Sequence, residues 1–192
     1  MNKRYMLEIV PRFTDEYDLA KALAKGEPRA QHVFYEKYAG KFLSICKRYV
    51  SDLMLAEDLM VESMMKIFEK VGQFNFNGSF EGWAKRIVVN EALMQIRKKK
   101  EISVDIADAE YEMEHSFPAF DFEAEELMKL IQTLPDGYRT VFNLYAIEGY
   151  SHAEICDLLG ISEGTSKSQL SRARKILADA LNSNPKYGYK IN

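Results

Sequence analysis

The 192-residue chain contains no run of about 18 apolar residues, the length that a helix needs to cross a membrane. We therefore expect no membrane insertion. The first residues, Met1–Pro11, carry Lys3 and Arg4 but lack the apolar core of a secretion signal. The sequence thus predicts a protein that stays in the cytoplasm.

Residues that commonly build catalytic or metal centres are scarce. The two cysteines, Cys46 and Cys156, lie far apart and belong to no CxxC motif, and the three histidines show no metal-ligand spacing. We expect free structural thiols, no metal and no cofactor. The sequence also lacks a recognisable nucleophile–base pair or phosphate-binding loop, so we do not expect an enzyme.

Helix-breaking residues are few as well, with 5 Pro and 10 Gly against 47% hydrophobic residues, which favours helices over strands. Apolar residues recur three or four positions apart, the period of an α-helix. This pattern predicts helices at about 17–24, 29–50, 53–71 and 80–100, and again at 122–133, 138–147, 152–159 and 163–181. The predicted fold class is all-α, with two small helical domains.

Charge is distributed unevenly along the chain. The net charge is −3, yet Glu101–Glu126 holds ten acidic residues and no Lys or Arg, so the remainder carries +7. The acidic segment has no sustained helical or strand period, which is typical of a flexible linker. We expect domains at 15–100 and 124–182 joined by an acidic linker at 101–123. Two basic domains indicate nucleic-acid binding.

The segment from Ser151 to Leu177 predicts a helix-turn-helix. Ser151 and Glu154 have the spacing of a capping box, Gly160 suits a left-handed helix end, and Ser162 is a good N-cap for the next helix. That second helix begins with small polar residues and continues with basic ones, so it fits the major groove of DNA. An ordinary helical hairpin with a solvated basic face is the less favoured alternative.

The sequence LPDGYRTVFNLYAIEGYSHAEICDLLGISEGTSKSQLSRARKIL resembles region 4 of the extracytoplasmic-function (ECF) sigma factors. The resemblance implies that this domain reads the −35 promoter element through its second helix. The residues expected to contact bases and phosphates are Thr165, Lys167, Ser168, Gln169, Ser171 and Arg172.

The sequence FYEKYAGKFLSICKRYVSDLMLAEDLMVESMMKIFEKV resembles regions 2.1 and 2.2 of the same family, with Ala56–Leu59 (AEDL) as its most specific part. The resemblance implies that this helix docks on the β′ clamp of core RNA polymerase. The expected contact residues are Asp58, Leu59, Glu62, Met65 and Lys66. Without the resemblance, a solvated helix face would be the preferred interpretation.

The sequence FNFNGSFEGWAKRIVVNEALMQIRKKK resembles regions 2.3 and 2.4, which implies recognition and melting of the −10 element. An aromatic loop beside a basic helix can capture a freed strand by stacking and phosphate contact. The expected residues are Phe76, Phe80, Arg86, Asn90, Arg97 and Lys98. Core packing is the alternative for Phe80 and the preferred interpretation for Trp83, and a solvated charge run is the alternative for the helix end.

The resemblance implies three partners: core RNA polymerase, through its β′ clamp and β flap; promoter DNA; and an anti-sigma factor. It also implies that the linker threads the polymerase cleft, although a solubilising spacer is an alternative. The segment SKSQLSRARK resembles members from the Bacteroidetes. Two rival functions remain: a helix-turn-helix regulator that binds duplex DNA alone, and, much less favoured, an enzyme acting on nucleic acid.

Overall fold

A computed structural model describes residues 13, 15–104 and 124–183. The described residues form helices and turns with no strand, so the predicted all-α class is confirmed. The chain divides into two compact units, one comprising 1–46 and 52–95, the other 47–51 and 96–192. None of the described helices is long and apolar enough to span a membrane.

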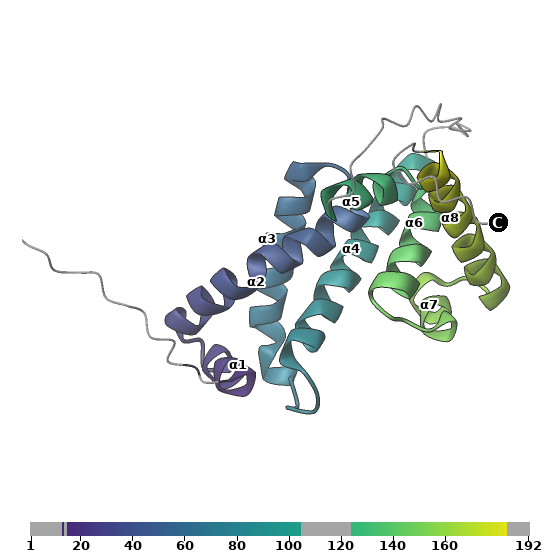
Figure 1. Cartoon of the computed structure of the whole chain (residues 1–192). Coiled ribbons are helices and arrows are strands. Elements are labelled where there is room, and N and C mark those ends of the chain that lie inside the picture. The colour runs from purple at the N-terminus through teal and green to yellow at the C-terminus, as the bar shows by residue number, and fades with distance from the viewer. Residues whose placement is uncertain (1–12, 14, 105–123, 184–192) are drawn as a thin grey trace, which may run out of the picture. The chain divides into compact units, whose positions relative to one another are not determined.

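The helices follow the predicted order (Figure 1). They are α1 (Glu16–Ala24), α2 (Pro28–Tyr49), α3 (Leu53–Lys70), the 3-10 turn η1 (Val71–Gln73), α4 (Phe80–Val104), α5 (Ala124–Gln132), α6 (Asp136–Phe142), the π-turn η2 (Asn143–Ile147), α7 (His152–Leu159) and α8 (Glu163–Asn182).

Aromatic side chains form the core of the first unit. The ring of Phe34, on α2, lies 5.7 Å from Phe68 on α3 and 5.7 Å from Phe80 on α4, measured between ring centroids. Phe34 and Phe80 are fully buried. Burial of large rings dominates the energetics of small cores, and these edge and tilted contacts add to it. One residue of α2 thus joins the three long helices of this unit.

The core of the second unit lies between α5, α6 and α8, where Leu134 and Leu177 are buried together. Arg139 is also buried, and its guanidinium donates to Gln132 O at 3.0 Å and pairs with Asp136 at 2.5 Å. These bonds satisfy a buried charge and fix the turn between α5 and α6.

Two features of the second unit differ from the prediction. Helix α6 begins at Asp136 rather than Tyr138, because Pro135 occupies the N-cap and an acidic residue is favourable in a first turn. The helix expected to continue to Ile147 changes at Asn143 to a π-turn, closed by the bond from Glu148 N to Asn143 O at 2.9 Å. The spacing of apolar residues in the sequence cannot distinguish a single π-turn from a continued α-helix.

Helix α4 continues to Val104, beyond the predicted end at Lys100, and so takes in the first residues of the predicted acidic linker. Residues 105–123, which make up the rest of that predicted linker, lie outside the described residues. Periodicity locates the centre of a helix better than its end, since the last turn depends on local capping.

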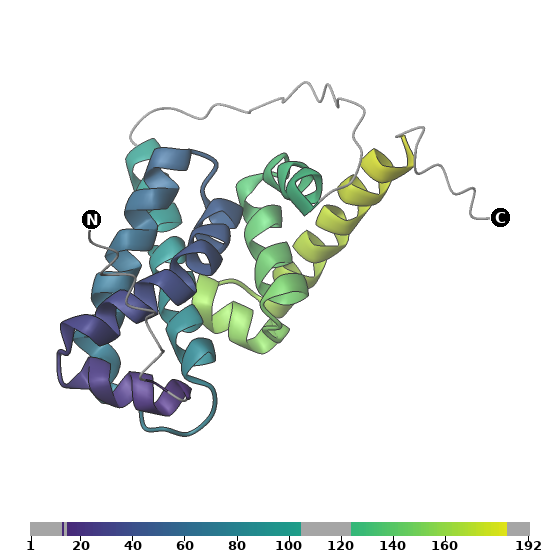
Figure 2. The same cartoon turned by 60° about the vertical axis from the view of Figure 1, so that its left-hand side comes forward.

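The predicted details of the helix-turn-helix are confirmed. Ser151 and Glu154 form a capping box, with both reciprocal bonds present. Gly160 ends α7 in the left-handed region at φ 66°, and Ser162 caps α8 by accepting from Thr165 N at 3.1 Å. Figures 1 and 2 both show α6, α7 and α8 grouped around the resulting turn.

Replacing Ser151 with Ala should lower the free energy of unfolding by about 1 kcal/mol, the usual loss for an N-cap. Ser171→Ala, an exposed serine of α8 with no capping role, is the matched control. Urea unfolding followed by far-UV circular dichroism measures both variants. Equal midpoints for Ser151→Ala and wild type would contradict this assignment of the cap.

Candidate nucleic-acid and protein interfaces

Helix α8 presents a polar, exposed face that contains most of the predicted −35 residues. The exposed members are Thr165, Lys167, Ser168, Ser171 and Arg172. Lys167 pairs with Glu163 at 2.8 Å, and this hydrogen bond raises the lysine pKa. Arg172 donates to Tyr138 Oη at 3.1 Å, which orients the guanidinium without burying it. This face can meet bases and phosphates.

Gln169, also predicted to contact DNA, is half-buried instead of exposed. Its amide lies against Gly137 of α6, so closely that a Cβ built on this glycine would be 3.4 Å from Gln169 Nε2. The side chain therefore lies partly between α6 and α8, and less of it is available to a ligand than the sequence suggested.

The opposite face of α8 is anchored by a feature that the sequence did not reveal. Ser166, which counted among the small polar residues expected at the groove, is fully buried, and its Oγ lies 2.9 Å from His152 Nδ1. The His152 ring stacks on Tyr145 at 4.5 Å, and the guanidinium of Arg174 lies 5.6 Å from the centre of the Tyr145 ring. These contacts hold α8 against α7 and η2.

The loop between η1 and α4 carries an exposed aromatic side chain. Phe76 is 42% exposed and takes a positive φ of 59°, an uncommon conformation for a residue with a bulky side chain. Its ring lies 5.1 Å from Phe74, which is buried, and Lys21 lies 5.8 Å above the ring. An accessible ring beside a cation suits stacking on a nucleobase.

Phe80, the second aromatic predicted to contact the −10 element, is fully buried, so that assignment is corrected. It packs between Phe34, Phe74 and Trp83 and cannot reach a ligand without opening the core. The alternative of core packing holds for Phe80 because it begins α4 on the face that meets α2. Trp83 is half-buried and packs against Phe80, as expected.

The polar residues predicted along α4 are at least partly accessible: Arg86, Asn90, Arg97 and Lys98. Spacings of four and eleven residues, close to whole turns of the helix, place Arg86, Asn90 and Arg97 on one face. Arg97 also donates to the carbonyl oxygen of Leu158, a contact within the second unit. Helix α4 thus offers a polar face suited to phosphates.

Two of the residues predicted to bind the polymerase have structural roles. Leu59 is 3% exposed and belongs to the core, so it cannot contact a partner directly. Lys66 forms an ion pair with Glu91 of α4, a carboxylate that is itself buried. Leu59 therefore stabilises the core, and Lys66 neutralises a buried carboxylate that would otherwise be costly. Asp58, Glu62 and Met65 are exposed.

The exposed surface of α3 includes two apolar side chains that the sequence did not lead us to expect, Met54 and Val61, beside the predicted contact residue Met65. Met54 is 74% exposed, Val61 50% and Met65 56%. With Asp58 they recur at intervals of four, three and four residues, so they form one line along the helix, here named the α3 stripe. The sequence did contain a signal for this surface, since these apolar residues recur at helical spacing on the same face as an acidic residue. Such a patch is typical of a protein interface.

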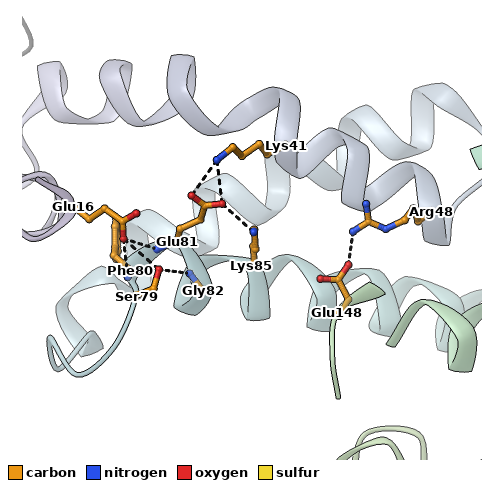
Figure 3. A network of polar contacts seen from close by, with 9 residues as sticks. All are labelled: Glu16, Lys41, Arg48, Ser79, Phe80, Glu81, Gly82, Lys85 and Glu148. Atoms are coloured by element: carbon orange, nitrogen blue, oxygen red, sulfur yellow. Dashed lines mark hydrogen bonds and ion pairs between the residues drawn. The ribbon is translucent and has the colours of Figure 1, made fainter. Parts of the chain in front are cut away.

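Charged side chains fix the start of α4 against α2 (Figure 3). Glu81 receives hydrogen bonds from Lys41 Nζ at 3.1 Å and pairs with Lys85 at 2.9 Å. Burial acts to raise the pKa of the Glu81 carboxyl, but the hydrogen bonds from the two lysines outweigh it and hold the pKa below its usual value. The figure also shows Arg48 paired with Glu148, both of the second unit.

Tyr38 lies beneath this network and is fully buried. Burial, followed by the negative charges of Glu16 and Glu81, raises its pKa from 10.0 to about 12. In the described part of the chain, no cluster of three or more His, Cys, Asp or Glu residues could hold a metal ion.

Comparison with protein families gives two matches. Residues 34–102 match the sigma-70 region 2 family, and residues 124–177 match the sigma-70 region 4 family. The first match includes α3, the aromatic loop and most of α4, and the second includes α5 to most of α8.

Two curated relatives are similar over most of their length. The RNA polymerase sigma-H factor of Pseudomonas aeruginosa is 30% identical over 186 residues, 88% of this chain and 95% of the relative. The ECF RNA polymerase sigma factor SigW of Bacillus subtilis is 30% identical over 175 residues, 84% of this chain and 94% of the relative.

A solved structure shares the fold. The sigma factor RpoE of Bartonella quintana, crystallised with the anti-sigma factor NepR, superimposes with a TM-score of 0.53 at 24% identity, covering 78% of this chain and 94% of that one.

The raised pKa of Tyr38 predicts an alkaline loss of stability. Because the neutral phenol is favoured in the folded state, its contribution is complete below pH 10 and is lost as the pH rises toward 12. Between these limits, the free energy of unfolding should fall more steeply for wild type than for Tyr38→Phe, which cannot ionise. Urea titrations at several pH values measure both slopes, and parallel slopes would contradict the assignment.

Proposed function

This chain belongs to the ECF family of sigma-70 RNA polymerase sigma factors, and from that premise we propose that it brings core polymerase to promoters, recognises their −10 and −35 elements and promotes DNA opening. One observation carries the proposal furthest. The ring of Phe76 is held exposed, in a strained backbone conformation, just before the helix that carries Arg86 and Asn90. Such a loop suits an unpaired base better than an intact duplex.

Recognition of the −35 element is proposed for the exposed face of α8. Thr165, Ser168 and Ser171 are small enough for the helix to enter the major groove, while Lys167 and Arg172 supply positive charge. The capped turn before α8 holds this face outward, as the contact between Ser166 and His152 secures its back.

Capture of the −10 element is proposed for Phe76 together with Arg86, Asn90, Arg97 and Lys98. Unstacking a base step costs a few kcal/mol, and this must be recovered by new contacts to the freed strand. Stacking on one exposed ring is worth about 1–3 kcal/mol, and the polar face of α4 can add phosphate contacts. The two contributions are of the size that strand separation requires.

Binding to core polymerase is proposed for the α3 stripe with the neighbouring Glu62. The stripe supplies apolar contact area, while Asp58 and Glu62 favour a basic partner surface. By the family resemblance, the partner of this helix is the β′ clamp, and the second domain meets the β flap. The chemistry of RNA synthesis then belongs to the polymerase, so this chain is not itself an enzyme.

Regulation by an anti-sigma factor is also proposed, since the Bartonella quintana sigma factor that shares the fold was crystallised with one. The α3 stripe and the exposed face of α8 are two surfaces that such a partner could cover. A cytoplasmic location follows from the need to meet polymerase. Placement of the chain near the Bacteroidetes members of the family rests only on the segment 166–175.

The rival function is a helix-turn-helix regulator that acts without polymerase. It accounts for α7 and α8 but leaves the exposed Phe76 and the α3 stripe without a role. It also makes a different prediction, since a stand-alone regulator binds its duplex site tightly by itself, whereas a sigma factor is expected to do so only within the holoenzyme.

Run-off transcription tests the proposal. Sigma-free core polymerase from a related bacterium, mixed with a library of promoter fragments, should produce transcripts from a sequence-defined subset only when this protein is added. The same templates without the protein are the control. Absence of transcripts and of core binding, together with specific duplex binding by the free chain, would favour the stand-alone regulator.

The α3 stripe gives a separate prediction. Replacing both Val61 and Met65 with Ser should weaken binding to core polymerase by about tenfold or more, because the few residues that dominate an interface cost more than about 1 kcal/mol each when they are truncated. Tyr35→Ser, which alters another exposed apolar residue at 44% exposure, is the control. Titration of labelled core measures the affinity, and an unchanged value for the double variant would exclude the stripe from the interface.

A further inference from the structure

Helix α1 lies beside the loop 74–79 in both cartoon views (Figures 1 and 2). The hydroxyl of Tyr17 donates to Gly78 O at 3.2 Å. Its ring stacks on Phe74 with an interplanar angle of 15° and lies 5.9 Å from the ring of Phe76. Tyr17 thus contacts both the backbone of the loop, at Gly78, and two of the loop's side chains, Phe74 and Phe76.

Glu16 fixes the other end of the loop, where α4 begins (Figure 3). Its Oε2 accepts from Phe80 N at 3.1 Å, from Glu81 N at 3.3 Å and from Ser79 Oγ at 3.3 Å. The first N–H groups of a helix have no partner inside it, and a negative charge there is favourable. A carboxylate more than sixty residues away in the sequence therefore completes the cap that Ser79 begins by accepting from Gly82 N.

The conformation of Phe76 requires such support. A positive φ for a residue with a Cβ costs about 1–2 kcal/mol, and strained residues persist only where their surroundings hold them. Phe76 remains 42% exposed, so burial of its own ring offsets only part of that cost. Within the loop, the bond from Asn77 N to Asn75 Oδ1 at 3.1 Å is local and does not involve the ring. The ring contacts come from α1 and from Phe74.

We propose that α1 is a positioning element for promoter opening, in which Glu16 and Tyr17 hold the loop so that Phe76 meets the unpaired strand. Glu16 fixes where α4 starts, and Tyr17 fixes the loop carbonyl and the direction of the Phe76 ring. The two residues act through Phe76 and need not touch DNA. This inference rests on the proposed function and adds to it the part of the chain that sets the geometry of strand capture.

Two conservative variants test the positioning role. Tyr17→Phe removes the bond to Gly78 but keeps the ring, and Glu16→Gln keeps the shape of the side chain but removes its charge. The matched controls are Tyr35→Phe and Glu36→Gln, which alter exposed residues of α2. Each full-length protein is assembled with core polymerase. The probe is a single-stranded oligonucleotide with the non-template −10 sequence of a promoter found by run-off transcription.

We expect Tyr17→Phe, which loses one hydrogen bond, and Glu16→Gln, which loses the negative charge at the start of α4, each to weaken oligonucleotide binding by about three- to tenfold. Affinity for core polymerase and the thermal midpoint of the free chain should change little, and the controls should behave as wild type. The chain has a single tryptophan, Trp83, whose ring lies 5.7 Å from Phe74, so its emission in the free protein reports whether the loop has moved.

A double-mutant cycle separates positioning from general stabilisation. If α1 acts through Phe76, adding Tyr17→Phe to Phe76→Ala should cause no further loss of oligonucleotide binding. Equal losses in both backgrounds would overturn the proposal, as would wild-type binding by Tyr17→Phe despite altered Trp83 emission. If Glu16→Gln proves unstable, Tyr17→Phe alone decides the outcome.

Failure of the inference can be told apart from failure of the proposed function. Wild-type protein that directs no transcription would refute the function itself. Wild-type protein that directs transcription, with α1 variants that bind the oligonucleotide equally well, would refute only the role of α1.

Discussion

The buried ring of Phe80 connects the parts of the first unit on which its surface depends. It contacts Phe34 of α2, Phe74 at the start of the loop and Trp83 one turn further along α4. Its backbone N–H is bound by Glu16 of α1. A displaced Phe80 would move the loop, the first turn of α4 and α1 together. The exposed position of Phe76 therefore depends on the buried packing of Phe80.

The second unit separates support from recognition in the same way. The fully buried Ser166 bonds to His152, while neighbouring residues on the outer face of α8 stay exposed. On α3 of the first unit, likewise, Lys66 pairs with the buried Glu91, while Asp58 and Met65 of the same helix are exposed. Buried polar groups need partners, and meeting that need decides which polar residues are left for ligands. The chemical type of a residue alone does not reveal whether it pairs inside the protein or remains exposed to a ligand.

Much of the fold could be predicted because its signals are local. The capping box at Ser151, the left-handed Gly160 and the helical apolar period each depend on residues within one turn of each other. The errors have non-local causes. Phe80 and Leu59 were assigned to contact surfaces but are buried by packing against other helices. The capping of α4 by Glu16 spans more than sixty residues, so no local pattern could indicate it.

The central claim, that this sigma factor opens DNA by capturing an unpaired strand at Phe76, is tested most directly by permanganate oxidation of thymines in holoenzyme–promoter complexes. Permanganate attacks thymines that have lost their stacking, so it reports opening and not merely binding. The account predicts reactive thymines in the −10 region with wild-type protein, and weaker reactivity with Phe76→Ala at equal promoter occupancy. A bound promoter whose thymines stay unreactive, or equal reactivity with both proteins, would contradict it.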